Sequence, residues 1–129
     1  MVITSYQYPQ YLYAFNNDEE TEQLPNGSWK ETIPSWELKA ACREETNGKG
    51  STIQTVNGEI LVFASLIQIP KGTVRINEGT EIIVTREEVN PNQLLEPDFI
   101  DSAKISGLVI AKGICQKYDF GRLHCRLWI

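Results

Sequence analysis

The sequence predicts an all-β fold, a small β-barrel or sandwich of about eight short antiparallel strands with long polar loops. Apolar side chains recur with a period of two residues, and Gly, Pro and Asn clusters separate the apolar stretches. Helical periodicity is almost absent. The chain of 129 residues has the size of one ordinary domain, so we expect residues 1–129 to form a single domain with a self-supporting core.

The first predicted element is an aromatic strand. Five aromatic residues fall within positions 6–15, and Pro9 shifts their alternation by one residue. Because proline lacks the N–H that a ladder needs, this pattern indicates an edge strand or a bulged strand. The acidic stretch 16–24 is predicted to be a mobile loop, and the sequence PNG at 25–27 is predicted to turn the chain before Trp29.

The next strands are predicted to form the centre of the fold. Residues 36–43 alternate apolar and charged side chains, which is typical of a strand buried on one face. The apolar run at 59–69 (EILVFASLIQI) is rich in β-branched residues and predicts one strand buried on both faces. Asn57-Gly58 predicts a type I′ turn that joins this run to a short strand at 52–56, because both positions of that turn need positive φ.

The middle of the chain is less regular. Alternation at 74–76 and an apolar run at 81–85 predict short strands, separated by a turn at 78–79. The stretch 87–104 (EEVNPNQLLEPDFIDSAK) contains two prolines and little periodicity. We expect it to be a long surface loop, with a short helical turn near 97–103, or else a partly ordered insertion.

The last predicted strands are 108–117 and 122–129, joined by a turn at 118–121, and we expect Ile129 to be packed. Alternation divides the closing strand into an apolar face of Leu123, Cys125, Leu127 and Ile129, and a basic face of Arg122, His124, Arg126 and Trp128. The predicted core of the whole domain includes Trp36, Leu38, Ile60, Val62, Phe63, Ile82, Val84, Ile110, Leu123 and Leu127.

Charge is unevenly distributed along the chain. Seventeen acidic and twelve basic residues give a net charge of −5, which argues against a general nucleic-acid binder. Residues 1–101 hold sixteen acids and seven bases, whereas 102–129 hold five bases and one acid. Such asymmetry can orient association with another chain or with a second copy. The alternative interpretation is two solvated faces of one domain.

Location is predicted from hydropathy and cysteine usage. No apolar run approaches the ~18 residues of a membrane span and nothing at the start has the pattern of a signal peptide, so we expect a cytoplasmic protein without a membrane partner. Cys42, Cys115 and Cys125 form no close pair, which favours free thiols in a reducing compartment. A bridge from Cys42 to Cys115 or to Cys125 remains an open alternative.

Candidate catalytic and metal-binding residues are few. The single histidine, His124, is adjacent to Cys125, but the two side chains point to opposite faces of one strand and cannot easily act together. No Cys/His pair has the spacing of a zinc site, and the acids at 18–22 lack the ligand ladder of a calcium loop. We therefore expect no enzyme activity, no cofactor and no metal site.

The string REETNGKGS at 43–51 contains part of a phosphate-binding loop, but its first glycine is missing and no helix is predicted to follow. A hairpin loop explains the glycines better, with Lys49 at its tip in reach of a phosphate or a partner's carboxylate. Single-strand binding needs aromatic residues beside basic ones. The tyrosine-rich start lies among acids and the Arg126/Trp128 face is small, so packing or a protein interface is the favoured interpretation of both.

The order of glycine, tryptophan and strand positions forms a pattern over most of the chain. A first strand is followed by a polar turn with Gly27 before Trp29, a strand that opens with Trp36, a glycine-bearing loop at 47–50, then hairpins and a closing strand. This order resembles the head–tail joining, or head-completion (connector), proteins of tailed bacteriophages. The strings CREETNGKGS and GRLHCRLWI look specific to such a family, whereas the tyrosine-rich start and the long loop depart from the pattern.

The resemblance implies a structural phage or prophage protein that forms a ring at the portal, seals the packaged DNA channel and joins head to tail. Its partners would be further copies of itself and the portal and tail proteins, with nucleic acid only near the DNA channel. A ring needs heterologous interfaces, for which the acidic loop and the basic closing strand are candidate facing patches. The candidate interface residues are Asp18, Glu19, Glu20, Glu22, Lys49, Arg122, His124, Arg126 and Trp128.

Two other classes of function stay open. The first is a small β-barrel that binds single-stranded nucleic acid or another protein. If it binds nucleic acid, its affinity should fall steeply as the salt concentration rises. An enzyme or ligand-binding barrel would need a deep apolar pocket with convergent polar groups.

Overall fold

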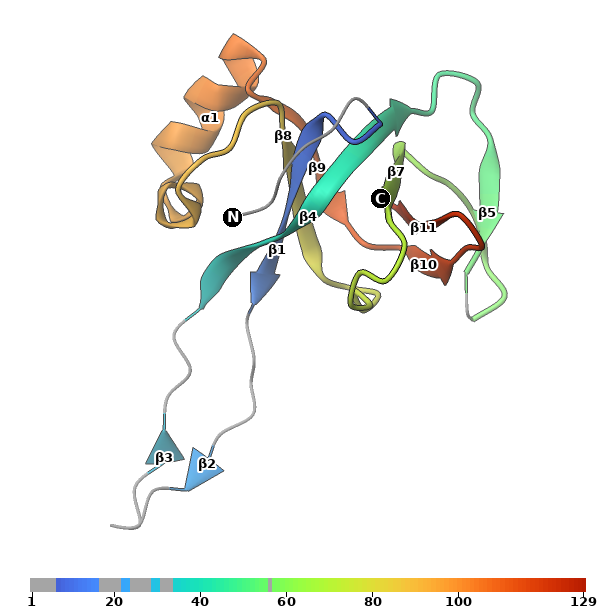
Figure 1. Cartoon of the computed structure of the whole chain (residues 1–129), viewed down its shortest axis with the longest axis horizontal. Helices are drawn as coiled ribbons and strands as arrows, with labels where there is room; N and C mark the ends of the chain where they lie inside the picture. The colour runs from blue at the N-terminus through green and yellow to red at the C-terminus, as the bar shows by residue number, and fades with distance from the viewer. Residues whose placement is uncertain (1–6, 17–21, 24–28, 31–33, 56) are drawn as a thin grey trace.

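The computed structural model describes residues 7–16, 22–23, 29–30, 34–55 and 57–129. Strands dominate these residues, and the predicted all-β class is confirmed (Figure 1). The strands are β1 Gln10–Asn16, β2 Glu22–Gln23, β3 Trp29–Lys30, β4 Ser35–Thr46, β5 Thr52–Gln54, β6 Ile60–Val62, β7 Ser65–Pro70, β8 Glu81–Thr85, β9 Val109–Ile114, β10 Lys117–Phe120 and β11 His124–Trp128. Seven of them form one antiparallel sheet in the order β10-β11-β7-β4-β1-β8-β9, beside the separate pairs β2-β3 and β5-β6.

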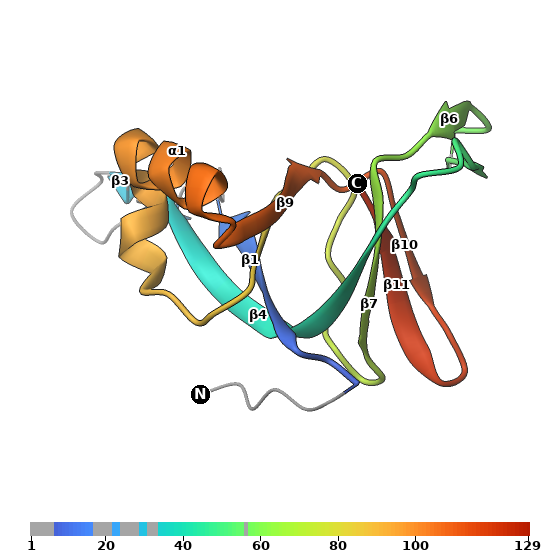
Figure 2. The same cartoon turned by 90° about the horizontal axis from the view of Figure 1, so that it is seen from above.

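Strand β4 belongs to both halves of the large sheet. From Ser35 to Cys42 it pairs with β1, and from Arg43 to Thr46 it pairs with β7. The strand is strongly curved along this length (Figure 2). The sheet therefore folds over into a β1-β8-β9 half and a β7-β11-β10 half, and a strand that changes sheets in this way is typical of orthogonal packing.

The sheet is open, because its edge strands β9 and β10 do not pair with each other. They are consecutive in the chain and separated by Cys115 and Gln116. The Cys115 N–H donates to the Thr80 oxygen at 2.8 Å, on the β8 side, and the Gln116 N–H donates to the Trp128 oxygen at 2.7 Å, on the β11 side. The chain thus joins the two halves at one corner, and closure into a barrel does not occur.

The main core lies between the two halves. Ile76 enters it from the segment between β7 and β8, where residues 74–76 form no strand and Val74 is exposed. The Tyr118 hydroxyl donates to the Thr73 oxygen of the same segment at 3.4 Å. The buried members of this core are Leu12, Ala14, Ala40, Cys42, Ile67, Ile69, Ile76, Ile82, Val84, Cys115, Tyr118, Cys125, Leu127 and Ile129.

A second core covers the outer face of the β1-β8-β9 half. It is built by the 3-10 helix η1 (Pro91–Leu95) and the helix α1 (Pro97–Ser106), which the views place over this half only (Figure 2). Leu94, Ile100 and Ala103 are buried against Tyr13 and Trp36. The prediction of a long surface loop at 87–104 is therefore wrong, although the predicted helical turn at 97–103 is present within α1.

Two prolines explain why this segment has the pattern of a loop in the sequence. Pro91 and Pro97 both stand at the start of a helix, where the missing N–H has no partner to lose. The side chain of Asn90 caps η1 by accepting a hydrogen bond from the Asn92 N–H at 3.0 Å. The two prolines, which suggest a loop in the sequence, therefore mark the first residues of helices.

The apolar run at 59–69 is two strands and not one. β6 ends at Val62 and β7 begins at Ser65, because the chain leaves the β5-β6 pair at Phe63 and Ala64 to enter the large sheet. Ile60 and Val62 are 72% and 66% exposed, so their assignment to the core is wrong.

The hairpin predicted at Asn57-Gly58 is confirmed, since β5 and β6 pair antiparallel across it. The turn is not type I′, because Gly58 has φ 84° while no described non-glycine residue has a positive φ. The Gly58 N–H donates to the Thr55 oxygen at 3.0 Å, and the Thr55 N–H donates to the Glu59 oxygen at 2.8 Å. One glycine is sufficient for this wider turn.

At the start of the described chain, the aromatic strand is central and not at an edge. β1 lies between β4 and β8. Its register with β4 shifts between Leu12 and Tyr13, where Lys39 of β4 is the extra residue, so the bulge lies in β4 and the prediction of a bulged aromatic strand is wrong. Pro9 precedes the strand, so its missing N–H costs no ladder bond. The mobile loop predicted within 16–24 and the turn predicted at 25–27 lie outside the described residues, apart from Asn16 and strand β2.

The closing hairpin is shifted from its predicted position. Residues 118–120 belong to β10, and the turn lies at 121–123, where a Cβ on Gly121 would collide with the His124 oxygen. Leu123 is 82% exposed in this turn, so its assignment to the core is wrong. Ile129 is packed as expected. Among the other predicted core residues, Trp36, Ile82, Val84 and Leu127 are buried, and Leu38, Phe63 and Ile110 are half-buried.

The three cysteines are free and buried, so neither of the open disulfide alternatives occurs. No helix among the described residues is long and apolar enough to cross a membrane.

Tyr13 fastens the helical segment to the sheet. Its side chain is fully buried, and its hydroxyl donates to the Val89 oxygen at 3.0 Å and accepts from the Val89 N–H at 2.8 Å. Tyr13→Phe leaves both Val89 groups without this partner, so we expect the free energy of unfolding to fall by about 1–3 kcal/mol in urea titrations. Tyr118→Phe is the matched control and should cost less, because its 3.4 Å hydrogen bond is long. Equal urea midpoints for Tyr13→Phe and wild type would refute this role.

The buried thiols predict a stability that declines at alkaline pH. Burial raises the pKa of Cys42 and of Cys115 from 9.0 to about 12, so the fold favours the neutral thiols. This contribution is complete below pH 9 and is lost as the pH rises towards 12. We expect the urea midpoint to fall over this range, and to fall less in a Cys42→Ala/Cys115→Ala variant. At about pH 8, a thiol reagent should react rapidly with all three cysteines only in denaturant, and fast reaction of Cys42 or Cys115 in the native protein would contradict the burial.

Candidate functional site

The outer face of the β7-β11-β10 half carries the basic side chains of the closing strand. Residues directly opposite each other in antiparallel strands share one face of a sheet. The register therefore aligns two rows across this face: Lys117, Trp128, Leu66 and Glu45 in one, and Asp119, Arg126, Gln68 and Arg43 in the other. The views show no helix over this half, in contrast to the other half of the sheet (Figures 1 and 2).

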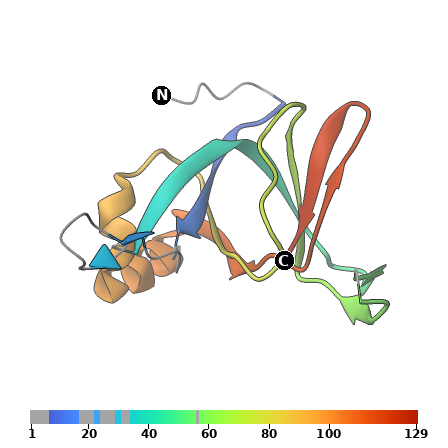
Figure 3. The same cartoon turned by 90° about the horizontal axis from the view of Figure 1, so that it is seen from below.

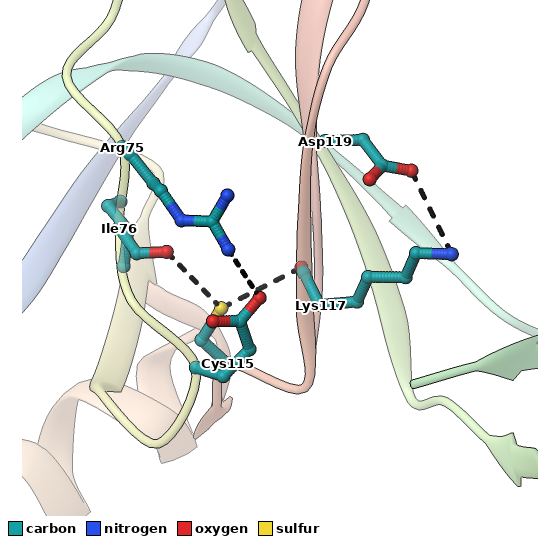
Figure 4. A network of polar contacts seen from close by, with 6 residues as sticks. Arg75, Ile76, Cys115, Lys117 and Asp119 are labelled. Atoms are coloured by element: carbon teal, nitrogen blue, oxygen red, sulfur yellow. Dashed lines mark hydrogen bonds and ion pairs between the residues drawn. The ribbon is translucent and has the colours of Figure 1, made fainter. Parts of the chain in front are cut away.

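Trp128 is covered by its own neighbours. The Lys117 ammonium and the Arg126 guanidinium each lie 5.6 Å from the centre of its ring, and the residue is only 8% exposed. The Lys117 ammonium also lies 3.9 Å from the Asp119 carboxylate (Figure 4). The indole therefore supports the two cations and offers no open face on which a base can stack.

The tip of the β10-β11 hairpin is both apolar and basic. Phe120 is 61% exposed, Leu123 is exposed, and Arg122 beside it is exposed as well. Arg122, Leu123 and Lys71 line a surface cleft of about 550 Å³. His124 is half-buried and lies opposite Pro70, whereas Cys125 is buried in the main core. The two side chains thus lie on opposite sides of the strand, as the alternation predicts.

Asn47 anchors the base of the β5-β6 ribbon. Its side-chain amide donates to the Ser51 oxygen at 2.9 Å and to the Phe63 oxygen at 2.7 Å, and its side-chain oxygen accepts from the Ser51 N–H at 3.1 Å. One side chain therefore ties together the segments that enter and leave the ribbon. The glycine-rich string leads into β5 and no helix follows it, which excludes P-loop geometry.

The β5-β6 ribbon projects from the body of the molecule and pairs only with itself (Figures 1 and 2). Ile60 and Val62 lie on one face of β6, since alternate residues of a strand share a face, and both are exposed. A surface cleft of about 370 Å³ at its base is lined by Lys49, Phe63 and Leu66, among other residues. Leu66 also belongs to the outer-face row of Trp128, so the ribbon base adjoins the basic face.

A third cleft, which is polar, lies between β1, β4 and the segment that joins β7 to β8. Its volume is about 210 Å³, and its lining includes Lys39 and Arg75. Both cations already contact carboxylates, Lys39 with Glu37 and Arg75 with Glu78, each at 2.7 Å. Hydrogen bonds from Lys39 and Asn16 lower the pKa of Glu37. These internal pairs leave little free charge for a ligand.

A buried thiol holds the corner beside this cleft. The Cys115 thiol lies 3.9 Å from the Ile76 oxygen and 3.7 Å from the Lys117 oxygen, as Figure 4 shows. Weak contacts of this length join the 73–80 segment to β10. The arrangement is structural packing around the corner. Burial and the nearby Glu78 carboxylate raise the pKa of the Cys115 thiol, which disfavours the thiolate that a nucleophile needs.

The predicted acidic partner of the basic strand is only partly described. Asp18, Glu19 and Glu20 lie outside the described residues, and Glu22 lies in β2 opposite Lys30 of β3. Arg122 and Arg126 are exposed as predicted, Lys49 is exposed near the ribbon base, and Trp128 is buried. In the part of the chain that the structure describes, no group of three His, Cys, Asp or Glu residues is arranged to hold a metal ion.

Comparisons of the chain with protein-family models, with curated proteins and with solved structures find no match.

Sequence reasoning missed several surface residues. Alternation alone predicts Ile60 and Leu123 in the core, and Phe120 is predicted only as part of a turn, although all three are exposed on projecting hairpins. The turn signals next to them, Asn57-Gly58 and Gly121, are the sequence features that could have indicated exposure. Asn47 had no such signal, because one of its hydrogen-bond partners, Phe63, is sixteen residues away.

Asn47→Ala should loosen the ribbon without unfolding the sheet. All three side-chain hydrogen bonds disappear, so amide hydrogen exchange within 52–62 should accelerate at least about tenfold, which corresponds to about one lost hydrogen bond, while β1 and β8 keep their protection. Asn47→Asp is the matched control, because it keeps the acceptor for Ser51 and loses only the donors, so its effect should be intermediate. Unchanged exchange in the ribbon of Asn47→Ala would show that Asn47 is not its anchor.

Proposed function

We propose that this chain is a structural phage or prophage protein that joins head to tail as a connector, assembling as a ring on the portal. The proposal rests on the pattern of Gly27, Trp29 and Trp36 and the strand order that resemble head-completion proteins. It is supported by surface features that suit protein contacts. The expected site of action is the virion, after synthesis in the cytoplasm.

The observation that carries the proposal is the apolar ribbon. Ile60 and Val62 are held away from the core on a two-stranded arm that pairs with no other strand of the described chain. Two neighbouring apolar side chains on one face of a projecting element suit a protein contact, because a partner that covers them removes apolar surface from water. The hydrogen bonds of Asn47 fix the base of the ribbon, so the ribbon projects in a defined direction. We assign this ribbon to the contact with the portal or the tail.

The alternative of single-strand binding has less support. Its natural platform on the basic face would be Trp128, but that ring is buried under Lys117 and Arg126. Base stacking needs an accessible aromatic face. Phe120 is exposed at the hairpin tip, but its ring packs edge-on against the buried Tyr118, with the ring centres 5.2 Å apart.

The test of the proposed function is co-sedimentation with portal-bearing capsids of the phage that encodes the chain. Ile60→Thr/Val62→Thr keeps β-branched side chains in the strand but removes two exposed apolar groups. If they are buried on binding, the affinity for capsids should fall at least about tenfold while the far-UV circular dichroism stays unchanged.

The matched control is Ile114→Thr/Val74→Thr, which makes the same two exchanges at exposed positions away from the ribbon. It should bind capsids like wild type. Equal binding by the ribbon variant would remove the ribbon from the interface. A wild-type protein that ignores capsids but binds single-stranded DNA with a steep salt dependence would replace the connector by the nucleic-acid alternative.

A further inference from the structure

The described surface has two charged ends of opposite sign. The acidic end lies on and around η1 and α1, where 86–104 contains five acids and two bases, Arg86 and Lys104, and so has a net charge of −3. Its residues are Glu87, Glu88, Glu96, Asp98 and Asp101, all exposed, with the exposed apolar residues Leu95 and Ile105 among them. The basic end is formed by the β10-β11 hairpin and the turn after β7. Its residues are Lys71, Arg122 and Arg126, all exposed, with Phe120 and Leu123.

The charged residues named for the two ends form no ion pair with another described residue. Ion pairs between described residues join Lys39 to Glu37, Arg75 to Glu78 and Lys117 to Asp119. The third pair lies within the β10-β11 hairpin, where its two charges cancel, and Arg126 contacts the Trp128 ring. Each end also exposes two large apolar side chains, which is the composition of an interface with an apolar centre and a charged rim. The two surfaces are complementary in charge and similar in apolar content.

The fold keeps the two ends apart. The acidic end covers the β1-β8-β9 half of the sheet, and the basic end is the outermost hairpin of the other half, as all three views show (Figures 1, 2 and 3). A two-fold contact centred on one end would place like charges together, and a two-fold contact that used both ends at once would stop at a dimer. A head-to-tail contact brings acid to base and continues beyond two copies.

We propose that the acidic end of one copy binds the basic end of the next, so that identical chains associate head to tail. Such heterologous contacts close into a ring when the rotation between copies closes. The inference deepens the proposed function and rests on it, because a connector ring requires one repeated contact of this kind. It also replaces the acidic loop at 18–22 by the helical segment as the partner of the closing strand.

The test is sedimentation velocity of the isolated full chain, without capsids, at about 0.05 M and about 0.5 M salt. Wild type should self-associate, and more weakly at the higher salt. Arg122→Glu/Arg126→Glu makes both ends acidic. Glu88→Lys/Asp101→Lys changes the net charge of 86–104 from −3 to +1, so both ends are basic. Each variant alone should self-associate at least about tenfold more weakly than wild type, because like charges then face each other.

The decisive sample is an equal mixture of the two variants. Alternating copies place an acidic end against a basic end at every contact, so association should return in the mixture although neither variant associates alone. This recovery also shows that both variants are folded. The matched controls are Lys49→Glu/Lys112→Glu and Glu59→Lys/Glu81→Lys, which make the same changes in net charge at exposed positions outside both ends and should behave like wild type.

Three results would overturn the proposal: a wild type that stays monomeric up to about 1 mM, charge-reversed variants that associate like their controls, or a mixture that does not recover. The capsid experiment separates this outcome from the proposed function. Capsid binding that depends on the ribbon without head-to-tail association would retain the connector function and reject this interface. Head-to-tail association without capsid binding would retain the interface and reject the connector function.

Discussion

The course of strand β4 is the constraint on which the two halves of the fold depend. One continuous backbone pairs with β1 over Ser35–Cys42 and with β7 over Arg43–Thr46, so neither ladder can form correctly without the other. Ala40 and Cys42 place this strand in the main core that both halves enclose. A slip of one residue would turn these side chains outward, so burial in the core fixes the register of both halves at once.

The alternation of apolar and polar residues predicted the positions of several strands and which of their side chains are buried. Strands at 36–43 and 81–85 and the burial of Ile82 and Leu127 follow from side chains that point alternately inward and outward. Alternation cannot tell a core strand from a projecting one, so Ile60 was predicted inside. Of the helices after β8, η1 was missed and α1 was predicted only as a short turn at 97–103, because proline at a helix start has the sequence appearance of proline in a loop.

In the candidate interface, too, some features could be predicted from the sequence and others could not. The exposure of Arg122 and Arg126 was predictable, since a charged side chain on the outer face of a strand seldom has another place to go. The burial of Trp128 was not, because it depends on Lys117, which reaches the ring from the neighbouring strand. The grouping of the five exposed acids around α1 was not predictable either, because it depends on the helices between β8 and β9 and on their packing against the sheet.

The self-contained pairing of β5 with β6 makes the ribbon a modular part of the chain. Because each added residue lengthens a strand by about 3.4 Å, two more residues in each strand would extend the arm by about 7 Å and leave every ladder of the large sheet intact. The reach of the arm and the stability of the core are therefore encoded by separate stretches of sequence. Substitutions or insertions at 48–62 change what the arm presents while the residues that fold the domain stay the same.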